Sequence, residues 1–224
     1  MIPWQLLDTT TVPGDGDELR LYRRDDEFSI KARHYELMNS RMHGSEDALA
    51  ELACQRLTDR PLSRVLIGGL GMGFTLAAAL KQLRPEVEVV VAELVPAVVE
   101  WNRGLLAELA GHPLDDPRVT VYEGDVGQLI RSGSDSYDAI LLDVDNGPEG
   151  LTRKENDSLY SPAGLNASLT ALRSKGIFGV WSISPDQRFS KRLRHAGFSV
   201  EETRARARGH HGGGRHMIWL GEKI

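Results

Sequence analysis

The chain has 224 residues, 41% of them hydrophobic, which suits one α/β domain with a sizeable core and a small extension. Its 27 Lys and Arg against 32 Asp and Glu give a net charge of −5, which argues against general affinity for nucleic acid. It has neither a signal-like N-terminus nor an apolar run long enough to span a membrane, so we expect a cytoplasmic protein with no membrane partner.

Residues 1–60 are expected to form a small N-terminal extension, followed by the main domain over residues 61–224. Apolar and polar residues alternate over 18–23 and 27–33, with two aspartates between these segments, which predicts a β-hairpin. Pro61 marks the expected boundary because proline interrupts regular structure.

One helix is expected at the end of the extension. Ser45 is a candidate N-cap, and Glu46 and Asp47 follow in the first turn, where carboxylates interact favourably with the helix dipole. Cys54 lies in the same predicted helix and is the single cysteine of the chain. We expect it to be a buried structural thiol in a reducing compartment.

From residue 61 onward, predicted strands alternate with predicted helices. The expected strands cover residues 65–67, 86–92, 118–122, 138–142 and 177–183, and the expected helices cover 74–80, 96–110 and 162–173. Strands separated by helices predict a parallel sheet covered on both faces, with ligands bound at the carboxyl ends of its strands. Two last strands, at about 198–207 and 216–220, flank a glycine-rich turn and predict an antiparallel hairpin.

A glycine-rich turn follows the first strand of the main domain. Its glycines are Gly68, Gly69, Gly71 and Gly73. Such a turn permits positive φ and lets a ligand approach the main chain at the start of a helix. The spacing from Gly69 is G-x-G-x-G, and the dinucleotide-binding pattern is excluded because position 74 is Phe. The turn resembles motif I of the class I S-adenosylmethionine-dependent transferases, so we expect a nucleoside site.

Acidic residues end the next three strands at the same edge of the predicted sheet. Glu93 follows the glycine turn by about twenty residues, the distance at which a carboxylate binds ribose hydroxyls. Asp125, with Val126 beside it, is expected to contact the nucleoside and can accept from an adenine amino group. Asp143 and Asp145 are the candidate catalytic acids, and Asp143 is also expected to contact the cofactor. Each acid alone could be a helix cap, but together with the glycine turn they favour a binding site.

These motifs resemble the spermidine synthase family. The matching segments are Val-Leu-Ile-Gly-Gly at 65–69, Glu93, Glu-Gly-Asp at 123–125, Tyr-Asp-Ala-Ile-Leu-Leu-Asp at 137–143 and Asp-Glu-Phe-Ser at 26–29. The resemblance implies a Rossmann-like class I methyltransferase fold, with a mostly parallel seven-stranded sheet, a C-terminal antiparallel hairpin and a small N-terminal β extension. It also implies a ribose role for Glu93, an adenine role for Asp125 and a place beside the transferred group for Asp143. Members of the family commonly act as homo-oligomers in the cytoplasm, so we expect a homodimer.

Departures from the family pattern decide the predicted reaction. Gly71 stands where spermidine synthases carry an Asp that holds the propylamine of decarboxylated S-adenosylmethionine, and Ile30 stands where they carry a tyrosine that helps to seat the polyamine. Without the Asp, the amine loses a partner and a carboxylate on the ligand is no longer repelled. We therefore predict S-adenosylmethionine as the cofactor and methyl transfer to a small amine or hydroxyl acceptor. Two alternatives stay open: a divergent aminopropyltransferase that uses decarboxylated S-adenosylmethionine and a polyamine, and a non-catalytic nucleoside-binding regulatory protein.

The acidic loop that begins at Asp143 has two candidate roles. Asp143 with Asp145 could accept a proton from the attacking amine or hydroxyl. Alternatively, these two residues and Asn146 could hold a divalent cation that activates a hydroxyl, although turn chemistry explains Asn146 equally well. We favour the acid-base role and assign no metal ligand.

The C-terminal quarter is rich in histidine and arginine. We expect the glycine-rich segment with His210, His211 and His216 to be a loop rather than a metal site, because a hairpin tip holds no fixed geometry. Arg204, Arg206 and Arg208 lie on one face of a predicted strand. We expect a solvated face, with an anionic acceptor or RNA as the alternative, so nucleic acid is not the expected partner.

Overall fold

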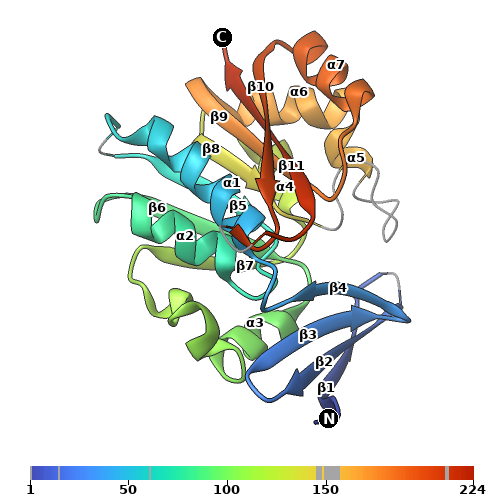
Figure 1. Cartoon of the computed structure of the whole chain (residues 1–224). Helices are drawn as coiled ribbons and strands as arrows, with labels where there is room; N and C mark the ends of the chain where they lie inside the picture. The colour runs from blue at the N-terminus through green and yellow to red at the C-terminus, as the bar shows by residue number, and fades with distance from the viewer. Residues whose placement is uncertain (1, 15, 61, 145–147, 149–156, 210–211) are drawn as a thin grey trace.

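The structure is a computed structural model that describes residues 2–14, 16–60, 62–144, 148, 157–209 and 212–224 (Figure 1). A four-stranded antiparallel sheet at the N-terminus lies beside a larger sheet of seven strands (Figure 1). The strands of the small sheet follow each other in chain order and are β1 (Gln5–Thr11), β2 (Glu18–Arg24), β3 (Glu27–Ala32) and β4 (Tyr35–Asn39). The predicted hairpin corresponds to β2 and β3, and β4 was not recognised in the sequence as a strand.

The large sheet has the order β10-β11-β9-β8-β5-β6-β7. Its strands are β5 (Arg64–Gly68), β6 (Glu88–Glu93), β7 (Val119–Glu123), β8 (Tyr137–Leu142), β9 (Leu172–Ser182), β10 (Phe198–Arg206) and β11 (Arg215–Lys223). The strands from β5 to β9 pair in parallel, and β11 pairs antiparallel with both β9 and β10. The predicted Rossmann-like fold, with a mostly parallel seven-stranded sheet and a C-terminal antiparallel hairpin, is confirmed.

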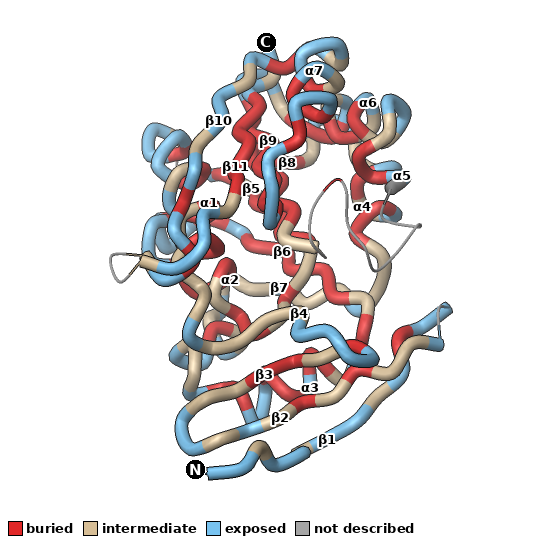
Figure 2. The backbone as a smooth tube through the Cα atoms, turned by 45° about the vertical axis from the view of Figure 1, so that its right-hand side comes forward, coloured by how far each residue is buried: buried red, intermediate tan, exposed pale blue. Residues whose placement is uncertain are grey.

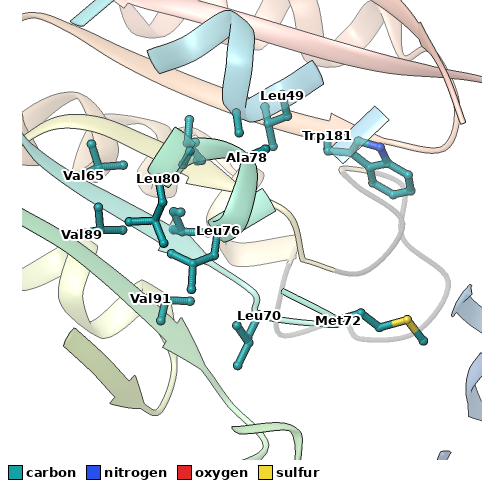
Figure 3. Close-up of a cluster of buried hydrophobic side chains, with 14 of the residues drawn as sticks. Leu49, Val65, Leu70, Met72, Leu76, Ala78, Leu80, Val89, Val91 and Trp181 are labelled. Atoms are coloured by element: carbon teal, nitrogen blue, oxygen red, sulfur yellow. The ribbon is translucent and has the colours of Figure 1, made fainter. Parts of the chain in front are cut away.

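Helices cover both faces of the large sheet because its strands are apolar on both faces (Figure 2). Val65 and Ile67 join a cluster with Leu49 and Leu76, whereas Leu66 between them belongs to a second cluster on the opposite face (Figure 3). The first cluster involves α1 (Gly44–Cys54), α2 (Phe74–Gln82) and α3 (Pro96–Arg103), and the second involves α4 (Val126–Ser132), α5 (Asp157–Tyr160), α6 (Pro162–Ala171) and α7 (Gln187–Ala196). Short 3₁₀ helices are η1 (Gln55–Leu57), η2 (Ala107–Ala110) and η3 (Pro113–Asp115).

Two details of the predicted helices are wrong. The helix expected over 96–110 ends at Arg103, because Gly104 takes a non-helical conformation with φ −124° and ψ −94°. Ser45 is not the N-cap of α1, since His43 occupies that position and makes no side-chain cap bond. The Ser45 hydroxyl contacts Glu46 and His216 instead.

The buried position of Cys54 is confirmed: it is 2% exposed, and burial raises the pKa of its thiol to about 12.

The strand order places a ligand-binding edge beside β5. After β5 the chain continues through β6 and β7 on one side, and it then returns through β8 to the other side of β5. Such a switch of direction opens a crevice at the carboxyl ends of the strands.

Among the helices that the structure describes, none combines the length and the apolar character needed to cross a membrane.

Candidate functional site

A cavity occupies this crevice, bounded on the other side by the N-terminal sheet and its loops. Clefts with apolar walls and a few polar groups are typical of small-molecule sites. The glycine turn and the ends of β6, β7 and β8 contribute Gly69, Gly71, Glu93, Gly124, Asp125, Val126 and Asp143. The N-terminal region contributes Val12, Asp17, Leu19, Ile30, Ala32, Leu37 and Met38.

Two of the four predicted glycines line this cavity. Gly69 has φ +90°, and a Cβ at this position would lie 2.2 Å from the carbonyl oxygen of Asp143. Gly71 has φ +54°, and a Cβ there would lie 2.6 Å from Cε of Met38. Gly68 and Gly73 are not among the described residues that line the cavity. The positive φ favours glycine at both positions, and close packing against the backbone requires it at Gly69.

Glu93 lies at the end of β6, with its carboxylate held by the backbone. Its Oε2 accepts the N–H of Leu70 at 2.9 Å and its Oε1 accepts the N–H of Val95 at 2.9 Å. Burial raises the pKa of Glu93, and these backbone donors oppose that shift. The backbone N–H groups of Gly71 and Leu94 act in the same direction, so the backbone holds this carboxylate at the edge of the cavity.

Asp125 is both a helix cap and a residue of the cavity. Its Oδ1 accepts the N–H of Gly127 at 2.8 Å at the start of α4, and its Oδ2 lies 3.0 Å from the Arg131 guanidinium. Val126, the first residue of α4, is buried and lines the cavity beside it. Asp125 therefore caps α4 and also lines the cavity, and its role toward a nucleoside stays a prediction.

Asp143 lies at the end of β8, next to the glycine turn. Its Oδ2 accepts the Thr75 hydroxyl at 2.5 Å. Burial raises the pKa of Asp143 to about 6, and the hydrogen bond from Thr75 opposes this shift. A carboxyl with such a pKa can take up and release a proton near neutral pH. Asp145, the other predicted catalytic acid, lies outside the described residues.

Met38, Glu46 and Thr75 are among the residues that the sequence analysis did not assign to the site. Glu46 is 9% exposed and shares a small cavity with Thr75 and Asp143. Burial raises its pKa to about 8, and the negative charge of Asp143 adds to the shift. Glu46 and Thr75 each fall in the first turn of a helix, where such residues are common, so no local signal marks either as part of a site.

The histidines and the possible metal ligands do not form a cluster in the described part of the chain. No group of three His, Cys, Asp or Glu side chains gathers there as a metal site. His216 lies in β11 and contacts Ser45 and Trp181. Asn146, His210 and His211 lie outside the described residues, as does Asp145.

Comparison with known proteins identifies relatives for this site and its scaffold. A family model described as the spermine/spermidine synthase domain matches residues 45–187. A polyamine aminopropyltransferase of Korarchaeum cryptofilum is 32% identical over 118 residues, which are 51% of this chain and 36% of that protein. A polyamine aminopropyltransferase of Corynebacterium efficiens is 33% identical over 131 residues, which are 57% of this chain and 24% of that protein. The chain thus matches only a minor part of the length of these relatives.

The fold also matches solved structures. The crystal structure of spermidine synthase from Thermotoga maritima superimposes with a TM-score of 0.78 at 17% identity, over 98% of this chain and 73% of that one. A spermidine synthase in complex with the transition state analogue AdoDATO gives a TM-score of 0.77 over the same shares. At this identity the likeness establishes the fold.

These relatives contradict the predicted methyltransferase. They are named polyamine aminopropyltransferases, so methyl transfer and S-adenosylmethionine as the methyl donor are not supported, and the prediction is wrong. The prediction of methyl transfer rested on Gly71, which stands where spermidine synthases carry an Asp. In the structure, a Cβ at Gly71 would meet only the flexible end of Met38, which can move, and the φ of +54° is the feature that favours glycine there. The identity of this one residue was therefore too narrow a basis for choosing the methionine derivative.

Proposed function

Because this chain belongs to the spermine/spermidine synthase domain family, we propose that it is an aminopropyltransferase. It would move the aminopropyl group of decarboxylated S-adenosylmethionine to an amine acceptor of the polyamine class. The support comes from the charges that line the cavity.

The cavity is acidic among the residues that the structure describes. Its lining includes Asp17, Glu93, Asp125 and Asp143, and no described Lys, Arg or His. Arg33 and Arg131 pair with Asp17 and Asp125 from outside the lining. Glu93 and Asp143 have no ion pair with a described residue, so a cationic ligand would meet uncompensated carboxylates there.

This charge pattern favours the decarboxylated donor. Decarboxylated S-adenosylmethionine carries a sulfonium and an ammonium, whereas S-adenosylmethionine also carries a carboxylate that would lie among acids. A cation placed beside Asp143 and Glu93 would also favour their ionised forms, against the effect of burial. Binding of the dication and ionisation of the site would therefore support each other.

The opposite wall suits an aliphatic amine. Val12, Leu19 and Ile30 are buried and apolar, with Asp17 and Asp143 among the other residues of the lining. A methylene chain with cationic ends can pack against such a wall while its amines face the carboxylates. The acceptor is thus proposed by class, as an aliphatic di- or polyamine.

In the proposed reaction, Glu93 binds the ribose, Asp125 binds the adenine and Asp143 lies beside the transferred group. Asp143 accepts a proton from the acceptor ammonium, which leaves a neutral nitrogen as the nucleophile. This nitrogen attacks the propyl carbon bonded to sulfur, the new C–N bond forms as the C–S bond breaks, and methylthioadenosine leaves as a neutral thioether. Alignment of the two substrates would supply much of the rate.

The first prediction concerns Asp143→Asn. We expect kcat for methylthioadenosine release to fall by about 10²- to 10⁴-fold, because the amide cannot accept the proton. Binding of methylthioadenosine, measured by calorimetry, should be retained. Asp115→Asn, at an exposed side chain outside the cavity, is the matched control and should behave as the wild type.

The assay supplies decarboxylated S-adenosylmethionine with a panel of aliphatic diamines and polyamines. Release of methylthioadenosine that depends on the amine supports the proposal. Tighter binding of S-adenosylmethionine than of its decarboxylated form would overturn it. Binding of the nucleoside without transfer to any acceptor would instead support a regulatory protein.

We also propose that the protein acts as a homodimer in the cytoplasm. The family relationship supports the dimer, and the single free thiol of Cys54 is compatible with a reducing compartment. Light scattering at micromolar concentration measures the oligomeric state, and a monomeric mass would contradict it.

A further inference from the structure

A second carboxyl, that of Glu46, lies in the same part of the molecule as Asp143. Asp143 lines both the large cavity and a smaller one, and the smaller cavity also contains Glu46, Asn39 and Thr75. Glu46 is 9% exposed and belongs to the first turn of α1, which packs against α2. The two carboxyls interact electrostatically, so a proton held by one affects the other.

Hydrogen bonds continue from Glu46 through a serine to a histidine. The Ser45 hydroxyl oxygen lies 2.6 Å from Oε2 of Glu46 and 2.8 Å from Nδ1 of His216. A hydroxyl donates one hydrogen bond and accepts others, so it can donate to either neighbour while accepting from the other. If Glu46 gives a proton to the Ser45 oxygen while Ser45 gives its own proton to His216, one proton moves from the carboxyl to the imidazole.

His216 connects this line with the protein surface. Its ring contacts Trp181 edge-on, with centroids 4.9 Å apart and an interplanar angle of 81°. It also lines a separate cavity together with Arg204 and Arg215, whose side chains are exposed. Burial lowers the pKa of His216, which favours release of a proton at neutral pH.

We propose that Glu46, Ser45 and His216 form a proton-transfer chain that carries the proton taken up by Asp143 to the cavity beside Arg204 and Arg215. This inference rests on the proposed amine transfer. The ammonium of the acceptor gives one proton to Asp143. Glu46, which is protonated at neutral pH, donates its proton to the Ser45 oxygen while the Ser45 proton moves to Nδ1 of neutral His216. The Glu46 carboxylate that remains then takes up the proton from Asp143. The imidazolium releases a proton to water at Nε2 and returns to its starting tautomer by exchange with water.

The surroundings of Glu46 are compatible with such a role. The charged and titratable groups around it are Asp143, His43 with its partner Asp47, and His216 through Ser45. None of the described groups is a guanidinium or ammonium in an ion pair with Glu46, which would hold it permanently ionised. Glu46, Ser45 and His216 are positioning and relay residues, since only Asp143 faces the reacting atoms.

The kinetic test compares Ser45→Ala and His216→Ala with His34→Gln, a control at an exposed histidine. We expect kcat to fall roughly tenfold to a hundredfold in the two relay variants, with KM for the nucleoside unchanged. Imidazole should restore kcat of His216→Ala in a saturable manner, because it can enter from the cavity beside Arg204. Rescue should rise with the fraction of neutral imidazole, and a purely structural role would show no such dependence.

The second measurement needs no turnover. The pKa of His216 is followed by NMR titration of its ring in the wild type, in Glu46→Gln and in Glu51→Gln, an exposed control on the same helix. We expect Glu46→Gln to shift the pKa of His216 and Glu51→Gln to leave it unchanged. An unshifted pKa in a folded Glu46→Gln variant overturns the chain.

The outcomes separate this inference from the proposed function. Wild-type kcat in folded Ser45→Ala and His216→Ala, with amine-dependent release of methylthioadenosine intact, overturns the proton-transfer chain and leaves the function standing. Loss of kcat without imidazole rescue also overturns it. If the wild type neither binds nor releases methylthioadenosine, the proposed function fails, and the titration then decides whether Glu46 and His216 are coupled. If His216→Ala does not fold, Ser45→Ala provides the same kinetic comparison.

Discussion

Glu46 is buried beside Asp143 and has no ion pair with any described residue. Burial, together with the charge of Asp143, raises its pKa from 4.5 to about 8. The unfolded chain exposes the same carboxyl to water and restores its ordinary pKa. A single side chain thus makes the free energy of unfolding depend on pH.

The sign of this dependence follows from the protons bound in each state. Between pH 4.5 and about pH 8 the folded chain holds a proton on Glu46 and the unfolded chain does not, so stability falls as pH rises. Glu46→Gln keeps the shape and removes the ionisation. We expect it to stabilise the fold by up to a few kcal/mol at pH 8.5 and to matter little at pH 5.

Thermal unfolding across this pH range measures the effect, with Glu51→Gln as the control on the same helix. A constant difference in melting temperature between Glu46→Gln and the wild type at every pH would show that ionisation of Glu46 is not the cause.

At the scale of elements, a hydrogen bond between β1 and α3 holds the N-terminal sheet against the main domain. The pairing of β1 with β2 shifts register between Leu6 and Asp8, which is a local irregularity of the ladder. Asp8 then accepts the buried indole N–H of Trp101 in α3, with Oδ2 and Nε1 2.6 Å apart. The N-terminal sheet, which forms one wall of the cavity, is therefore held in place by a hydrogen bond between residues 93 positions apart in the chain.

Asp8→Ala tests this bond. It leaves the indole N–H without its acceptor, so we expect the free energy of unfolding to fall by about 1–3 kcal/mol in urea titrations. Thr9→Ala, at the exposed neighbour in β1, should change stability much less. In a double-mutant cycle, Asp8→Ala should cost less in a Trp101→Phe background; equal costs in both backgrounds would contradict the assignment.

For the molecule as a whole, the site lies between two sheets that are separate in hydrogen bonding. Gly69 and Asp143 come from the large sheet and its loops, whereas Leu19 and Ile30 come from the small one. A ligand that contacts both walls should hold the two sheets together, because it binds only the folded arrangement.

We expect methylthioadenosine at 100 times its dissociation constant to stabilise the fold by about 2.7 kcal/mol. Hydrogen exchange should slow in β2 and β3 as well as in the turn after β5. The Asp125→Ala variant, with the proposed adenine contact removed, should need more ligand for the same protection. Protection confined to the large sheet would place the N-terminal sheet outside the site.

Local patterns in the sequence predicted much of the fold. Alternation with a period of two and helical spacing predicted the order of strands and helices in the main domain, and chain order with parallel pairing placed Gly69, Glu93, Asp125 and Asp143 on one edge. The division at residue 61 and the individual roles of the site residues stay predictions. The family likeness rested on the same local motifs.

The remaining features depend on contacts between distant positions. Met38 covers Gly71, Thr75 donates to Asp143 across 68 positions, and Ser45 contacts His216 across 171. The same residues could occur in a helix turn or at a strand end of any protein, since their side-chain chemistry is common. Burial raised the pKa values of Glu46 and Asp143, and burial exists only after the sheet and helices have packed.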